Sequence, residues 1–117
     1  MDKAVEARGD QKTVAEVFLS ALSDNGVEYV FANGGTDFAP IIEALVSASQ
    51  AGEKIPQFIT VPHENVAMAM AEGYYRLSGK PAGVMVHVTV GTANTICGVM
   101  NASRDNVPIL VMAGRTP

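Results

Sequence analysis

The sequence predicts an α/β fold with a doubly wound, mainly parallel sheet and helices on both of its faces. Four short apolar segments, rich in β-branched residues, alternate with longer segments of helical periodicity. Nearly continuous apolar strands indicate a sheet that is buried on both sides, and long crossovers favour parallel pairing. Because such crossovers are right-handed, the doubly wound arrangement is the simplest topology for this order of elements.

The first helix is predicted to start at Thr13. Thr13 and Glu16 have the spacing of a capping box, in which each side chain accepts a hydrogen bond from the other residue's backbone N–H. The pair Asn25-Gly26 is expected to end this helix. The polar residues 1–12 are predicted to form a flexible segment, which leaves residues 13–117 as one domain.

A strand at 27–32 and a second helix are expected next. The strand leads into a glycine-containing turn at 33–36, where Thr36 or Asp37 is placed to cap the helix. Pro40 then falls in the first turn of the helix, where a missing backbone N–H is tolerated.

The same alternation continues to the end of the sequence. We expect strands at 57–61, 82–90 and 108–113, and helices at 64–77 and 92–104. The last strand is apolar and would leave an exposed edge or an uncovered face of the sheet, because no helix follows it. The sequence is therefore typical of an incomplete domain, which is part of a larger protein or lies against a partner.

Composition and charge exclude several classes of protein. Hydrophobic residues make up 48% of the chain and charged residues 17%, which is a globular composition. The net charge is -4 and Lys and Arg are scattered, so a nucleic-acid interface is not expected. The single cysteine, Cys97, cannot form a disulfide within the chain. No signal peptide and no apolar run of about 18 residues occurs, and we expect a cytoplasmic protein without membrane contact.

Four segments follow the predicted strands and should meet at one edge of the sheet, where open parallel sheets bind ligands. These segments are 33–36, 62–65, 89–94 and 114–116. Two of them, "NGG" and "VGTAN", read as glycine turns whose backbone N–H groups could bind an anion. Neither is a P-loop or a G-x-G-x-x-G motif, so a tight turn without a ligand is the alternative.

The histidines and the cysteine do not indicate a metal site. His87 is expected inside a strand, as a histidine satisfied within the sheet, and Cys97 is expected to pack on a helix beside Ile96 and Met100. No Ser-His-Asp or Cys-His arrangement of a nucleophile can be recognised. We therefore predict no metal ligands in this chain.

Glu64 has two interpretations from the residues alone. A glutamate in the first turn of a helix is favoured by the helix dipole, which is a sufficient structural reason. Its neighbours are apolar, however, and burial among them would raise the pKa of the carboxyl group, as at sites of proton transfer. The sequence pattern leaves both interpretations open.

Two longer runs, in register with each other, carry a resemblance to a known family. They are "HEN…A…AEGYYRLSGKPA" and "GTANT…G…NASRDNVPILVMAGRTP", and "VFANGGTDFAPIIEAL" fits the same alignment. Together they resemble the N-terminal pyrimidine-binding domain of thiamine diphosphate-dependent enzymes, in particular the acetolactate synthase-like group and the 2-oxo acid decarboxylases. The resemblance runs from about residue 13 to the end.

The resemblance implies roles for particular residues. Glu64 would hydrogen-bond the aminopyrimidine ring of the cofactor and activate it as the catalytic residue, with Pro62, Thr92 and Asn94 also near that ring. Five further residues would lie near the substrate or the thiazolium ring: Gly34, Gly35, Thr36, Asp37 and His63. A small apolar residue is common in acetolactate synthases at the position of Asp37, so an aspartate there would alter which second substrate is accepted.

The resemblance also implies an enzyme that decarboxylates or ligates 2-oxo acids, that is, a lyase or a transferase. Relatives bind the diphosphate and Mg²⁺ through a second domain with a G-D-G…N-N stretch, which this sequence lacks. The chain alone is therefore expected to be inactive, as half of a site formed between chains of a homodimer or homotetramer. Some relatives also bind FAD. Two alternatives are a free-standing α subunit of a two-chain decarboxylase and a non-catalytic nucleotide- or anion-binding module.

Overall fold

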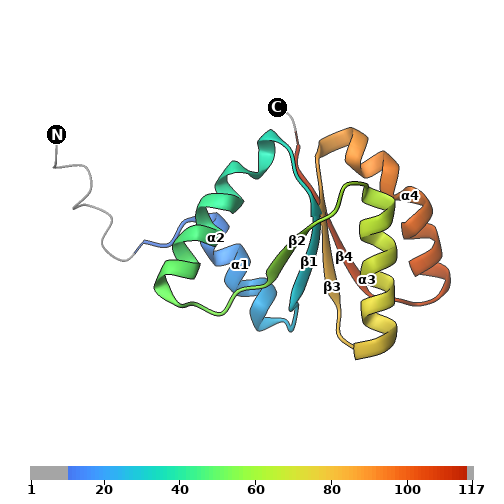
Figure 1. The fold of residues 1–117 in the computed structure, drawn as a ribbon, viewed down its shortest axis with the longest axis horizontal. Coiled ribbons are helices and arrows are strands. Elements are labelled where there is room, and N and C mark those ends of the chain that lie inside the picture. Colours follow the sequence, from blue (N-terminus) through green and yellow to red (C-terminus); the bar gives the residue numbers. More distant parts are fainter. Residues whose placement is uncertain (1–10, 116–117) are drawn as a thin grey trace.

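The computed structural model describes residues 11–115 and contains a parallel sheet between two pairs of helices (Figure 1). In the spatial order β2-β1-β3-β4, the strands are β1 (Tyr29–Asn33), β2 (Gln57–Thr60), β3 (Ala82–Val86) and β4 (Ile109–Ala113). The helices are α1 (Val14–Asp24), α2 (Ala39–Ala51), α3 (Glu64–Ser78) and α4 (Val88–Arg104), and a 3-10 turn, η1 (Thr36–Phe38), precedes α2. The predicted fold class is confirmed. The flexible segment expected at 1–12 lies almost wholly outside the described residues.

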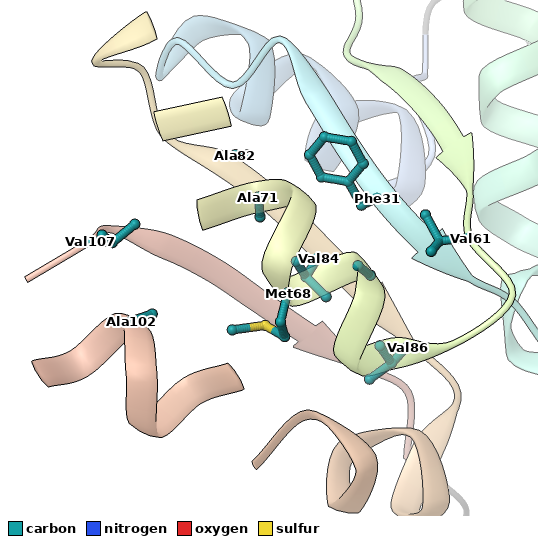
Figure 2. Packing of buried hydrophobic residues seen from close by; sticks show 10 residues of the cluster. Phe31, Val61, Met68, Ala71, Ala82, Val84, Val86, Ala102 and Val107 are labelled. Carbon is teal, nitrogen blue, oxygen red and sulfur yellow. The ribbon is translucent and has the colours of Figure 1, made fainter. Parts of the chain in front are cut away.

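Helices cover both faces of the sheet because alternate residues of a strand point to opposite sides. In β1, Val30 and Ala32 pack in the layer of α1 and α2, together with Leu19 of α1. Phe31, between them, packs in the layer of α3 and α4. Figure 2 shows this second layer, in which Val84 of β3 lies beside Met68 of α3 and Phe31 of β1 belongs to the same cluster.

The order of the strands creates a change of direction beside β1. The chain passes from β1 outward to β2, and then returns to place β3 on the other side of β1. Asn33, the last residue of β1, is in register with Val86, the last residue of β3. Open α/β sheets bind their ligands at such a switch point, outside the carboxyl ends of the strands.

Helices α3 and α4 lie unusually close to each other at Gly98. A Cβ atom on Gly98 would stand 2.4 Å from Cβ of Met68, so only glycine fits between the helices at this point. Met68 lies one turn after Glu64 on α3, and Gly98 lies one turn after Asn94 on α4. This contact therefore sets the distance between the helices where those two polar side chains emerge.

The capping box at the start of α1 is confirmed, but the expected cap of the second helix is wrong. The Thr13 hydroxyl accepts from the backbone N–H of Glu16 at 3.2 Å, and Glu16 accepts from the backbone N–H of Thr13 at 2.7 Å. Neither Thr36 nor Asp37 caps α2, because the turn η1 intervenes. The carboxylate of Asp37 is instead turned toward β3 and β4, as described below.

The strand expected at 82–90 is four residues shorter, and α4 starts at Val88 instead of near residue 92. The sequence Val88-Thr89-Val90 is β-branched and favours a strand, but tertiary packing overrides this preference. Gly91 lies within the first turn of α4, where a Cβ atom would stand 3.0 Å from Cβ of Val86. "VGTAN" is therefore helix, and the expected glycine turn at this place does not exist.

Several apolar side chains remain exposed. Cys97 is exposed, which contradicts its predicted packing role. β4 lies at the edge of the sheet, and its residues Leu110 and Val111 are 44% and 37% exposed, so this strand is incompletely covered, as predicted. Among the described residues, no helix has the length and apolar character needed to cross a membrane.

Candidate functional site

Glu64 is the first residue of α3 and lies where β2 leads into that helix. It is 7% exposed and one of few buried polar residues in the described part of the chain. His63 caps the helix, since its Nδ1 atom accepts a hydrogen bond from the backbone N–H of Asn65 at 3.1 Å. The imidazole of His63 is thus used at the helix end, on the exposed side of the loop.

Two asparagines from other elements hold the carboxylate of Glu64. The amide of Asn33, at the end of β1, donates to Oε1 at 3.0 Å, and the amide of Asn94, on α4, donates to Oε2 at 3.1 Å. The three residues are brought together by the strand order, which places β1 between β2 and β3. The prediction that strand ends meet at one edge is thereby confirmed for Asn33 and Glu64.

The pKa of Glu64 is lowered, in contrast to the rise that burial among its apolar neighbours alone would cause. Its own backbone N–H is the largest cause, and the amides of Asn94 and Asn33 and the nearby His63 add to it. Burial acts in the opposite direction but is outweighed. Donors that bind the ionised carboxylate stabilise it, so Glu64 is an ionised buried carboxylate at neutral pH.

The carboxylate can accept a further donor. It offers about four lone-pair positions, and the amides of Asn33 and Asn94 occupy one on each oxygen. An N–H group of a heterocyclic ring is a suitable additional partner. Among residues 11–115, no three side chains of His, Cys, Asp or Glu are grouped so as to hold a metal ion.

The other residues predicted for the cofactor ring lie near Glu64 but do not all contact it. Pro62 is exposed in the loop before α3. The hydroxyl of Thr92 donates to the carbonyl of Val88 within α4 at 2.6 Å, so among these residues only Asn94 bonds to Glu64. Thr92 borders an open hollow of about 520 Å³ between α4 and the end of β4.

The residues predicted for the substrate surround the end of β1. Gly34, Gly35 and Asn33 all line one apolar hollow of about 470 Å³. Thr36 is exposed at the start of η1. Asp37, the next residue, is directed toward His87, and the two side chains lie within hydrogen-bond distance of each other.

The position predicted for His87 is wrong, because this residue follows β3 and stands at the N-cap position of α4, where its side chain makes no capping hydrogen bond. Its Nδ1 atom lies 2.6 Å from Oδ1 of Asp37. The pair was missed because the strand was predicted to continue through His87. Asn33 was missed as a partner of Glu64, although its place directly after a buried strand was a usable signal.

Comparisons with known proteins identify the family to which this chain belongs. Residues 12–117 match the family model described as "Thiamine pyrophosphate enzyme, N-terminal TPP binding domain". The acetolactate synthase large subunit of Haemophilus influenzae is 36% identical over 101 residues, which cover 86% of this chain and 17% of that protein. The chloroplastic acetolactate synthase of Arabidopsis thaliana is 34% identical over 103 residues, which cover 88% of this chain and 15% of that protein.

Two solved structures are similar in fold. One, titled as a thiamin diphosphate-dependent enzyme from Mycobacterium smegmatis, superimposes with a TM-score of 0.75 at 31% identity over 92% of this chain and 19% of that one. The other is the thiamine diphosphate-dependent 4-hydroxybenzoylformate decarboxylase of Rhodococcus jostii RHA1, with a TM-score of 0.77 at 26% identity over 90% and 19% of the chains. The chain thus spans less than a fifth of each of these proteins. Its match over residues 12–117 shows that it belongs to the family of N-terminal domains of thiamine pyrophosphate enzymes.

Proposed function

We propose that this chain supplies the pyrimidine-binding half of the active site of an acetolactate synthase-like enzyme, which decarboxylates or ligates 2-oxo acids. The observation that carries the proposal is the buried, ionised carboxylate of Glu64, held between Asn33 and Asn94 at the switch point of the sheet. The similar proteins are named as an acetolactate synthase and as a thiamine diphosphate-dependent decarboxylase. These names support a reaction on 2-oxo acids.

Glu64 would bind a ring nitrogen of the cofactor's aminopyrimidine and exchange a proton there. Because the two amides and the backbone N–H of Glu64 leave one acceptor position on the carboxylate, the ring N–H can be received without displacing either amide. Thiamine diphosphate, when bound, supplies the nucleophilic carbon that adds to the carbonyl of the 2-oxo acid. This chain would orient the aminopyrimidine ring, exclude water with the apolar side chains around Glu64, and move one proton at Glu64.

The other half of the site would come from a different segment or a second copy of the chain. We propose that this other half binds the diphosphate and Mg²⁺, since the described residues offer no group of metal ligands. We propose a homodimer or homotetramer with the active site between chains, in which a second copy supplies this other half. Pro62 and Thr92 would border the cofactor, and His63 and the turn from Gly34 to Asp37 would border the substrate.

The test is the variant Glu64→Gln in the full-length protein. We expect the exchange of the C2 proton of bound thiamine diphosphate, followed by NMR after mixing with deuterium oxide, to slow by about 10²- to 10⁴-fold, the usual contribution of a positioned acid or base. Glu72→Gln is a matched control, because Glu72 lies two turns later on α3 and pairs with Arg76 at the surface. Exchange at the wild-type rate in Glu64→Gln would refute the proposal.

A further inference from the structure

A second pair of polar side chains lies at the same edge of the sheet as Glu64. Asp37 comes from η1 and His87 from the start of α4, 50 residues later, and Oδ1 of Asp37 lies 2.6 Å from Nδ1 of His87. The side chain of Asp37 is 16% exposed and that of His87 is 41% exposed. His87 directly follows Val86, the register partner of Asn33, which itself donates to Glu64. The two polar groups therefore border one site.

The carboxylate of Asp37 is held in an unusual way. Its second oxygen, Oδ2, is buried and has no hydrogen-bond partner within the described part of the chain. A Cβ atom on Gly114 would stand 1.9 Å from Oδ2, so the end of β4 fits against this oxygen only because residue 114 is glycine. Leaving a buried oxygen without a donor is costly, and natural proteins rarely retain one without a functional reason.

The imidazole of His87 is held just as closely. A Cβ atom on Gly35 would stand 2.3 Å from Nδ1 of His87, so the ring lies directly over the glycine turn that follows β1. Val88, the next residue, has a φ of 31°, which is an outlier for a β-branched residue. Backbone strain of this kind is retained where the surrounding structure fixes it, and it is concentrated at functional sites.

The contact with Asp37 occupies Nδ1 of the His87 ring, and the second ring nitrogen, Nε2, takes no part in it. With Nδ1 donating to Asp37, Nε2 is the nitrogen that can give a proton to a ligand or take one from it. A carboxylate that accepts from Nδ1–H holds an imidazole in one tautomer and one orientation, which is how such pairs are used in general acid–base catalysis.

We propose that Asp37 and His87 form an acid–base couple that exchanges a proton with the substrate derived from the 2-oxo acid, beside Glu64. His87 is the catalytic residue and Asp37 its positioning residue. His87, protonated on both nitrogens, gives the Nε2 proton to the substrate atom on which negative charge develops. The N–H electron pair stays on Nε2, a new C–H or O–H bond forms, and water returns a proton to the ring. This inference rests on the proposed function.

The first test uses His87→Gln and Asp37→Ala in the full-length enzyme, with the best substrate from a panel of 2-oxo acids that runs from pyruvate to an aromatic member. We expect kcat to fall by about 10²- to 10⁴-fold in His87→Gln and by less in Asp37→Ala, with little change in KM. The C2 exchange of thiamine diphosphate should keep its wild-type rate in both variants. Asp105→Asn, which changes a surface carboxylate paired with Arg76, is the matched control.

The second test does not depend on turnover. In ¹⁵N NMR spectra, the signals lost in His87→Gln identify His87, and the wild-type ring should show a protonated Nδ1 atom that becomes mixed with the other tautomer in Asp37→Ala. Gly114→Ala should have the same effect, because its methyl group displaces Oδ2 of Asp37. Unchanged His87 signals in Asp37→Ala, or an unchanged kcat in His87→Gln with normal C2 exchange, would overturn the couple alone. C2 exchange that is insensitive to Glu64→Gln would overturn the proposed function and the couple with it.

Discussion

The contact of Gly98 with Met68 predicts opposite effects of the same substitution at two helix glycines. Gly98→Ala places a methyl group 2.4 Å from Cβ of Met68, whereas carbon atoms in contact prefer about 3.5 to 4.0 Å. Relieving that overlap requires α3 and α4 to separate by about 1 Å. Gly73 on α3 has no atom within 4 Å of its would-be Cβ and serves as the matched control.

The two variants should differ clearly in stability. Alanine in place of glycine stabilises a helix interior by about 1 kcal/mol, which is the whole effect expected for Gly73→Ala. At Gly98 the gain in helix stability is opposed by overpacking against Met68, which costs about 1 to 3 kcal/mol. We expect the upper end of this range because the two Cβ atoms would be only 2.4 Å apart. We therefore expect a difference of about 2 to 3 kcal/mol, or about 10 to 20 °C in Tm for a domain of this size.

Urea and thermal unfolding, followed by circular dichroism, measure this difference. Gly98→Ala should also weaken the hydrogen bond between Asn94 and Glu64, because both bonded residues lie one turn from the contact. C2 exchange should then slow in Gly98→Ala but not in Gly73→Ala. Equal stabilisation by both substitutions would refute the close packing of α3 on α4.

Two further predictions concern Glu64 and the start of α1. Because the pKa of Glu64 is lowered in the folded protein, its carboxylate contributes stability in full above its ordinary value of 4.5 and loses it as the pH falls through the lower folded value. Glu64→Gln should therefore flatten the stability curve below pH 4.5, measured by urea unfolding, and an unchanged slope would contradict this. Thr13→Ala should lower the free energy of unfolding by about 1 kcal/mol, since the capping box with Glu16 is lost, and no measurable change would contradict the cap.

The sequence was sufficient to predict the order of the elements and the place of Glu64, because both depend on local patterns. A short apolar strand followed by Pro62-His63-Glu64 and an alanine-rich segment marks the junction of strand and helix without tertiary information. The capping box at Thr13 is equally local. Such features are decided by neighbouring residues, and the structure agrees with them.

The sequence-based predictions were wrong or incomplete where contacts between residues far apart in the sequence determine the structure. The three β-branched residues from Val88 to Val90 favour a strand, yet in the folded domain they form the first turn of α4. The error at this boundary placed His87 within the sheet and concealed its pairing with Asp37. The direction of the pKa shift of Glu64 stayed open for a similar reason, because two of the donors that lower the pKa lie about 30 residues away on either side.

The separation of these residues along the chain has a consequence for folding. The bonds of Glu64 to Asn33 and Asn94 span 31 and 30 residues, and the pair of Asp37 and His87 spans 50. Parallel strands with long connections close large loops before their contacts form, which makes such contacts slow to appear. Neither polar cluster can assemble in a nascent chain before β3 has joined β1, so the site cannot bind a ligand until the sheet has its central pair of strands. The chemical shift of the Glu64 carboxylate would thus report the arrival of β3 in a refolding experiment.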